Sequence, residues 1–328
     1  MADNKVTIVI PNYNGNKYLD ACLRSLKKQT VAAPVIVVDN GSTDDCIETL
    51  RCSIKRHTDC YPEITIHELS DNTGFANAVN VGIELSQTEY VILLNNDTVA
   101  NEKMTEKLLV AISENEKVFS VGAKMLQMKE PHNIDDCGDL YCALGWAFSP
   151  GRDKPAKSYG KKTAVTSACA GAAIYRKSIF DKIGLFDEAH FCYLEDVDVG
   201  YRARIYGYKN LYDPSAYVYH AGSGTSGSRY NEFKEELTSA NNIYLIYKNM
   251  PALQILINLP LLLVGIIVKQ IYFSRKGLGK SYFMGLLRGF KKISKGVNKK
   301  VPFDKKNLIN YFVLELELLF NCIRRFVG

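Results

Sequence analysis

The sequence of 328 residues lacks the features that mark several protein classes. Its nine cysteines form no C-x-x-C pair and are odd in number, so neither a disulfide framework nor a zinc site is indicated. The N-terminus, MADNKVTIVI, has no basic segment that leads into an apolar run, and we expect no signal peptide. Reduced thiols and residence in the cytoplasm are therefore expected.

Positive charge is concentrated in one region. The formal net charge is +6, but residues 269–306 contain twelve Lys and Arg against one acid, Asp304, which leaves about −5 on the rest. A basic segment on a mildly acidic protein argues against binding of nucleic acid in a groove across the fold. We expect this segment alone to contact a surface of anionic lipid headgroups.

Hydrophobic patterning predicts an α/β fold. Apolar, β-rich runs begin near residues 5, 35, 64 and 90, and segments with helical periodicity separate them. This spacing is typical of βαβ units and a parallel sheet, and right-handed crossovers make it a doubly wound domain. The pattern loosens after the first half, about 1–115. For the second half, about 116–250, we expect strands at 117–122, 163–175 and 215–220 and helices over about 196–206 and 232–250.

Residues 251–328 are predicted to form a separate helical region. The apolar stretch 252–268 is interrupted only by Gln254, Asn258 and Pro260 and is at the short limit for a spanning helix. Its Asn and Pro favour a helix lying in the membrane plane over a spanning one, and a buried core helix is the third alternative. Basic and aromatic residues follow, so we expect 251–306 to bind the cytoplasmic membrane leaflet.

The last amphipathic segment, residues 308–327, completes this region. It is expected to lie on the membrane as well or to pair with a second subunit, as in a homodimer.

Polar residues follow three of the predicted strands. The first ends in Pro11-Asn12-Tyr13-Asn14, the second in Asp39-Asn40-Gly41-Ser42 and the fourth in Asn95-Asn96-Asp97. In open α/β sheets ligands bind beyond the carboxyl ends of the strands, so the three ends predict one binding crevice. Ordinary turn and capping roles are the alternative explanation for each end taken singly.

Five segments carry a family resemblance: PNYNG at 11–15, VVDNGSTD at 37–44, DNTGFANAVNVGI at 71–83, LLNNDT at 93–98, and FDEAHFCYLEDVDVGYRARIYGY at 186–208 with His220 after it. The chain resembles, over roughly residues 5–250, the family 2 inverting glycosyltransferases of GT-A fold. Within that family it is most similar to the bacterial rhamnosyltransferase-like branch that builds cell-surface polysaccharides. The resemblance implies a donor half, the first 115 residues, and an acceptor half after it.

The resemblance implies a nucleotide-diphosphate sugar as donor. Asp39 would accept the imide N–H of the base, and Pro11, Asn12 and Tyr13 would flank the nucleoside, with Asn96 in the same donor site. Asn72 and Gly74 open a crossover helix whose amides would favour phosphate or ribose.

A divalent cation is the implied cofactor. Asp97 and His220 would be its protein ligands, and an oxygen-plus-imidazole set suits Mn²⁺ as well as Mg²⁺. The family's metal motif is usually Asp-x-Asp, and here Asn95 occupies its first position, so the site loses one charge. Without the family context, a lone His is more often a hydrogen-bonded surface residue.

Asp196 is the implied catalytic base for an inverting transfer. Glu195 and Asp198 would support it by orienting the acceptor or by pairing with Arg202. Acids at a helix N-terminus are otherwise explained by the helix dipole. The small residues Ala170 and Gly171 would leave room for the acceptor, a lipid-linked glycan or polysaccharide, and Cys169 is interpreted as packing.

Two motifs limit the function further. Residues 222–227 fit G-x-G-x-x-G but lack the early βαβ context of a dinucleotide site, so we interpret them as a loop closing over the diphosphate. The only tryptophan is Trp146, and the Gln-x-x-Arg-Trp motif of processive relatives is therefore missing, which favours a single addition or a few.

Three alternatives stay open. dTDP-L-rhamnose is the favoured donor, with UDP-sugars as the other choice. A sugar nucleotidyltransferase would need a phosphate loop after its first strand, and PNYNGNKYL is not one. The non-enzymatic alternative is an inactive nucleotide-sugar-binding subunit of a membrane glycan synthase, which Asn95 keeps open.

Overall fold

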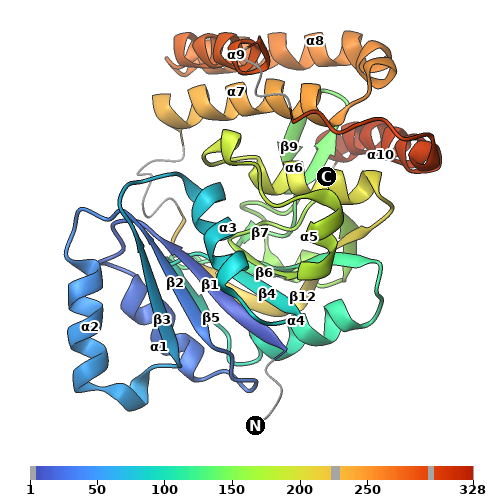
Figure 1. Cartoon of the computed structure of the whole chain (residues 1–328). Helices are drawn as coiled ribbons and strands as arrows, with labels where there is room; N and C mark the ends of the chain where they lie inside the picture. The colour runs from blue at the N-terminus through green and yellow to red at the C-terminus, as the bar shows by residue number, and fades with distance from the viewer. Residues whose placement is uncertain (1–4, 223–229, 295–298, 328) are drawn as a thin grey trace.

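The centre of the computed structural model, which describes residues 5–222, 230–294 and 299–327, is a mixed sheet (Figure 1). Its main strands lie in the order β10-β12-β6-β11-β4-β1-β2-β3. The four strands of the first half pair in parallel: β1 (Val6–Asn12), β2 (Val35–Asn40), β3 (Ile64–Leu69) and β4 (Tyr90–Leu94). The parallel α/β arrangement predicted for the first half is confirmed.

The second half of the sheet is mixed. β11 (Ala172–Arg176) runs antiparallel between β4 and β6 (Val118–Gln127), and β12 (Lys209–His220) pairs in parallel with β6. The single strand predicted over 163–175 is wrong: β10 (Thr163–Val165) forms the sheet edge against β12, and β11 lies at the centre. Residues 166–171 connect them. Four short strands were not predicted, because three residues give no periodicity: β5 (Thr98–Ala100), β7 (Ile134–Asp136), β8 (Leu140–Cys142) and β9 (Trp146–Phe148).

Helices cover both faces of the sheet. Alternation along β1 sends Val6, Ile8 and Ile10 into one core and Val9 into the other. The first core includes α1 (Leu19–Lys27), α2 (Cys46–Arg56) and α4 (Met104–Ser113), and the second includes α3 (Phe75–Leu85), α5 (Lys177–Ile183) and α6 (Glu195–Ile205). Short 3-10 turns are η1 (Thr58–Cys60), η2 (Ala156–Tyr159), η3 (Glu188–His190) and η4 (Lys305–Asn307).

The C-terminal helices are packed onto the domain that contains the sheet. In Figure 1, α8 (Ala252–Arg275) and α9 (Gly279–Ser294) lie above α7 (Glu232–Asn249), while α10 (Leu308–Val327) lies beside α6. One core cluster joins residues from both sides of position 250, including Tyr141, Tyr201, Leu245, Leu262 and Leu314. Residues 251–327 therefore share a hydrophobic core with the preceding domain.

The polar residues that interrupt the apolar stretch of α8 face the protein. Asn258 and Gln254 are 1% and 7% exposed, and their side-chain amides donate to the Glu315 carboxylate of α10 at 2.9 Å. With Leu262 and Gly265 they form the buried side of the helix. Among the described residues, α8 is one helix that could cross a membrane by length and composition, and 22% of its most apolar window is buried.

Candidate active site

The carboxyl ends of β1, β2 and β4 are joined by a chain of side-chain hydrogen bonds. Asn12 Nδ2 donates to Asp39 Oδ1 at 2.8 Å, and Asn96 Nδ2 donates to Asn12 Oδ1 at 2.7 Å. The sheet register sets Asn12 directly beside Asp39. All three side chains are at least 93% buried, and each polar group finds a partner. The three strand ends therefore converge, as the sequence predicted.

Asp39 is held in a fixed orientation. Its Oδ1 also accepts from Ser42 Oγ at 2.6 Å, while its Oδ2 accepts the Ser42 amide at 3.1 Å. The neighbouring loop is fixed as well, because Asn14 adopts a left-handed conformation and its side-chain oxygen accepts the Thr43 amide at 2.8 Å. Pro11, near the end of β1, and Tyr13, in the loop after it, are partly exposed. The residues predicted to flank a nucleoside lie together at the carboxyl ends of β1 and β2.

Asn72 and Gly74 lie beside this edge, at the start of α3. Asn72 Oδ1 accepts from Asn40 Nδ2 at 3.0 Å, which joins the loop to the end of β2. Gly74 has φ +91°, and a Cβ there would lie 2.6 Å from the ring of Phe191. The amide of Ala76 already donates to the Phe191 carbonyl at 3.1 Å. Part of this helix N-terminus is thus occupied by the loop before α6.

Asp97 and His220 lie in contact, as expected of a metal-ligand pair. Pairing of β5 with β12 sets His220 opposite Thr98, and Nε2 of His220 lies 3.0 Å from Asp97 Oδ1. Two adjacent ligands about 2.1 Å from one octahedral cation are separated by about 3 Å. The oxygen and nitrogen therefore fit a shared Mg²⁺ or Mn²⁺. Asn95 Nδ2 is 3.4 Å from the same ring nitrogen.

Asp135 supports His220 from the other side. Its Oδ2 lies 2.6 Å from His220 Nδ1, an arrangement that leaves Nε2 available to a metal. Burial disfavours the charged imidazole, but the hydrogen bonds that the ring donates to Asp135 and Asp97 raise the pKa of His220 to about 9, so a metal ion would have to replace the Nε2 proton. Arg152 in turn binds the Asp135 backbone carbonyl at 3.0 Å. Sequence reasoning missed Asp135, because the three-residue strand β7 carries no recognisable motif.

The candidate base begins α6 and touches the small-residue turn before β11. Asp196 Oδ2 accepts from the Ala170 amide at 3.3 Å, and Oδ1 accepts from the Val197 amide at 2.8 Å. The adjacent Gly171 carbonyl accepts from the Asn95 amide at 2.9 Å, and a Cβ at Gly171 would lie 2.9 Å from Asn95 Nδ2. The turn therefore connects the base to the metal-ligand motif.

Asp196 sits among other acids. Asp136, Asp139 and Cys169 bring their ligand atoms within 4.8 Å of one another. Burial raises the pKa of Asp196 to about 6, and burial together with the charges of Asp136 and Asp196 raises that of Asp139. Glu195 is 6% exposed, and its Oε2 has no partner among the described residues. A carboxylate with a pKa near neutrality suits a general base. Asp136 and Asp139 were not predicted.

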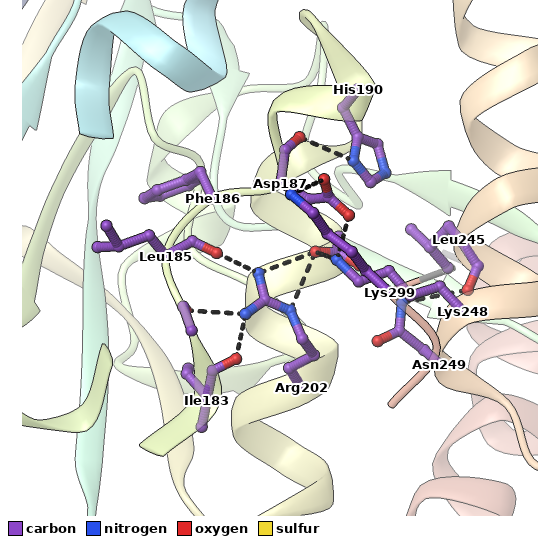
Figure 2. Close-up of polar contacts among 12 residues, drawn as sticks. Ile183, Leu185, Phe186, Asp187, His190, Arg202, Leu245, Lys248, Asn249 and Lys299 are labelled. Atoms are coloured by element: carbon purple, nitrogen blue, oxygen red, sulfur yellow. Dashed lines mark hydrogen bonds and ion pairs between the residues drawn. The ribbon is translucent and has the colours of Figure 1, made fainter. Parts of the chain in front are cut away.

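Asp198 and Arg202 pair with each other in a buried network (Figure 2). Asp198 is fully buried, lies 2.9 Å from Arg202 Nη2, and accepts from Lys248 Nζ at 2.8 Å. Burial opposes its ionisation, but the charges of Arg202 and Lys248 hold the pKa of Asp198 below its usual value. Lys248 also bonds to Asp187 at 2.7 Å. Of the two roles considered, pairing is the one found, and the network ties α6 to α7.

A cavity of about 380 Å³ adjoins this network. Arg202 and Lys248 line it together with Lys299 and Lys300, and none of the predicted donor-site residues does. It is thus separate from the strand ends that form the candidate site. Of the predicted diphosphate loop, only Gly222 falls among the described residues.

The loop before the base has an unusual backbone. Phe191, Tyr193 and Leu194 have φ values of 63°, 69° and 66°, a region that bulky residues rarely occupy. Each such conformation costs roughly 1–3 kcal/mol and persists only where surrounding contacts impose it. This segment leads directly into Glu195 and Asp196, so contacts around it bear on the position of the base.

The fold and the site together define a class. A mixed α/β sheet of GT-A type carries a candidate nucleotide site at its strand ends, a candidate metal pair and a candidate base, and helices follow at the C-terminus. Residues 7–184 match the model of the family described as glycosyl transferase family 2. The chain belongs to that family.

Curated relatives are distant. A glycosyltransferase of Streptococcus pneumoniae serotype 4, GlyG, is 29% identical over 118 residues, and the chain covers 38% of its length. The N-acetylglucosaminyl-diphospho-decaprenol L-rhamnosyltransferase of Mycobacterium tuberculosis is 26% identical over 248 residues, which cover 67% of this chain and 77% of that protein.

Solved structures of similar fold contain nucleotides and Mn²⁺. A mannosyltransferase of Pyrobaculum calidifontis in complex with GDP-Man and Mn²⁺ has a TM-score of 0.56 and 16% identity, covering 95% of this chain and 87% of that chain. Residues 1–349 of TarS from S. aureus in complex with UDP have a TM-score of 0.52 and 17% identity, covering 89% and 92%. At such identities the likeness concerns the fold alone.

Proposed function

We propose that the protein transfers a single sugar, with inversion, from a nucleotide-diphosphate donor to a hydroxyl group of a lipid-linked glycan or polysaccharide in cell-surface glycan synthesis. The observation that carries the proposal is the connection of Asp97 and His220, through the Gly171 turn, to the partly buried Asp196. dTDP-L-rhamnose is the favoured donor, because the mycobacterial relative is a rhamnosyltransferase. UDP-sugars are the second choice.

Asp196 would act as the base. As the acceptor oxygen attacks the anomeric carbon, its proton passes to the Asp196 carboxylate, and the bond to the leaving diphosphate breaks on the opposite face. Asp97 and His220 would hold Mn²⁺ or Mg²⁺, which supplies positive charge to the diphosphate. Asp135 would keep the imidazole of His220 in the tautomer that presents Nε2.

Donor binding would use the joined strand ends. Asp39 Oδ2 accepts only one described hydrogen bond, from a backbone amide, so it retains capacity for the imide N–H of a base. Asn12 and Asn96 would hold that carboxylate in place, and Pro11 and Tyr13 would flank the ring. Asn72 and Gly74 would contribute to ribose or phosphate binding from the start of α3.

We also propose that the C-terminal helices attach the enzyme to the cytoplasmic face of a membrane. All but four of the exposed large hydrophobic residues among those described fall between positions 253 and 327. On α8 they occupy the side opposite Gln254 and Asn258, and they include Leu253, Leu256 and Ile267 at 57–68% exposure. A monomeric soluble surface rarely carries so large an apolar patch.

An in-plane position of α8 accounts for both of its sides. Its inward side is bound to Glu315 and to the shared core, whereas a spanning helix would have to leave those contacts. Exposed basic residues accompany the apolar side and suit anionic headgroups: Arg275, Lys276, Lys280 and Arg288. Attachment would bring the acceptor site close to lipid-linked substrates.

The competing function is an inactive nucleotide-sugar-binding subunit. Asn95 favours it, because an amide in place of a carboxylate weakens the metal site by one charge. A screen of dTDP-, UDP- and GDP-sugars with Mn²⁺ or Mg²⁺, read by release of free nucleotide, separates the two. Metal-dependent turnover of one donor that is lost in Asp97→Ala supports the enzyme. Binding without release under acceptor-free and lipid-acceptor conditions supports the inactive subunit.

A further inference from the structure

The left-handed loop before α6 is held by one side chain of α7. Asn241 is fully buried, and its Nδ2 lies 2.8–2.9 Å from the carbonyl oxygens of His190, Cys192 and Tyr193. The loop turns these three carbonyls toward one point, whereas the Phe191 carbonyl accepts from Ala76. A single amide group thereby serves three carbonyl acceptors of the loop. These hydrogen bonds offset the energetic cost of the left-handed backbone within the same loop.

A lysine of α9 fixes the orientation of that amide. Lys292 Nζ donates to Asn241 Oδ1 at 2.7 Å and to the Ala189 carbonyl at 2.6 Å. Since an ammonium group can only donate, Oδ1 must face Lys292, and Nδ2 must therefore face the loop. Lys292 binds the loop both directly and through Asn241.

Close packing of α9 on α7 brings Lys292 to this position. A Cβ at Gly285 would lie 1.8 Å from Ser239 Oγ, and one at Gly289 would lie 2.6 Å from the Ile243 Cβ. Only glycine allows the two helices to approach this closely. On its other side α9 exposes Phe290, at 58%, to the surroundings. One helix thus carries part of the apolar surface and contacts the loop that leads to the base.

We propose that Asn241 and Lys292 are positioning residues, which hold the strained loop 189–194 so that Asp196 lies at the acceptor site. The inference rests on the proposed function for the role of Asp196. It makes the C-terminal helices necessary for the transfer step itself, in addition to any role at the membrane. Small displacements of a reacting group cost about 100-fold in rate.

Neighbouring lysines of α9 provide a matched pair of variants for the full-length protein. Lys292→Met removes the loop contact, whereas Lys291→Met removes the same charge from an exposed position. Lys292→Arg keeps charge and donors. Hydrogen exchange of the amides of 189–198 reports loop order without any substrate. Transfer rate and the dissociation constant of the nucleotide with Mn²⁺ are measured in parallel.

We expect Lys292→Met to raise exchange in the 189–198 segment, to leave the strand ends at 10–15 and 37–44 unchanged, and to lower kcat about 10- to 100-fold with nucleotide binding kept. Lys291→Met should resemble the wild type, and Lys292→Arg should recover part of the rate. Unchanged exchange in Lys292→Met, or equal effects of both Met variants, would overturn the inference. If Lys292→Met raises exchange but the wild type transfers no sugar, the proposed function is overturned and the loop contact still holds.

Discussion

His220 Nε2 lies 3.0 Å from Asp97 Oδ1, while Nδ1 of the same ring lies 2.6 Å from Asp135. The imidazole is thus oriented by Asp135 and lies beside Asp97, its proposed partner in metal binding. We therefore expect substitutions of Asp97 and Asp135 to affect metal binding to different degrees.

Asp97→Ala and His220→Ala should each abolish Mn²⁺ binding at the site and metal-dependent nucleotide release. Asp135→Asn should weaken metal affinity about 10- to 100-fold while leaving the site usable, because it acts through the ring. Calorimetric titration with MnCl₂ in the presence of nucleotide measures both. Equal losses of metal affinity in all three variants would contradict the assignment of Asp97 and His220 as direct ligands and of Asp135 as a residue that acts through the ring.

Asp196→Asn should lower kcat about 100- to 10,000-fold with nucleotide binding unchanged, since only the proton acceptor is removed. In the wild type the rate should rise with pH through about 6, where the carboxyl group loses its proton. The measurement is a pH profile of kcat/KM. An acid limb that persists in Asp196→Asn would assign the titration to another group.

Asp139→Asn should stabilise the protein at pH 8. Because burial and neighbouring acids raise the folded-state pKa of Asp139, its ionisation costs stability as pH rises above the unfolded-state pKa. We expect Tm to rise by about 2 °C or more at pH 8 and to change little near pH 4. Thermal unfolding of the metal-free protein at both pH values provides the measurement.

Asp198→Asn is the control for Asp139→Asn, because it should lower the stability of the protein where Asp139→Asn should raise it. The pKa of Asp198 is lowered by Arg202 and Lys248, so loss of the carboxylate leaves buried cations without their partner and should cost about 3–5 kcal/mol at pH 7. Stabilisation by both variants would indicate that general charge reduction, and not the local acid cluster, governs the effect.

Leu256→Asp combined with Ile267→Asp should reduce binding to phosphatidylglycerol vesicles about 100-fold or more, because two exposed apolar side chains lose their contact with lipid. Val110→Asp changes an exposed apolar residue of α4 and should leave binding unchanged. Vesicle sedimentation of the folded variants measures the effect. Loss of binding by Val110→Asp alone would place the surface elsewhere.

Sequence patterns predicted the features that rest on local residue types. Strands β1, β2 and β4 are mainly apolar runs that end in polar residues, so Asn12, Asp39 and Asn96 could be predicted to lie together. Family motifs were needed to choose Asp97 and His220, which are far apart in sequence.

Other features depend on tertiary contacts that leave no local signal. Helix α9 falls within the helical region predicted over 251–328, but the packing of its Gly285 and Gly289 against α7 was not predicted. Phe191 and Leu194 have positive φ values although neither is Gly or Asn, so the sequence gives no signal for them. Asn241 of α7, which contacts this loop, lies about 50 residues away, so no sequence window contains both.

The pairing of Asn258 with Glu315 has a consequence for how the protein would meet a bilayer. Because the side-chain amide nitrogens of Gln254 and Asn258 donate to Glu315 inside the protein, these donors would stay paired when the helix leaves the lipid. A protein attached by such a surface would exchange between the lipid surface and the surrounding solution. The amount of enzyme at work would then follow the area and charge of the lipid available, and one molecule could serve several acceptors by lateral diffusion without leaving the surface.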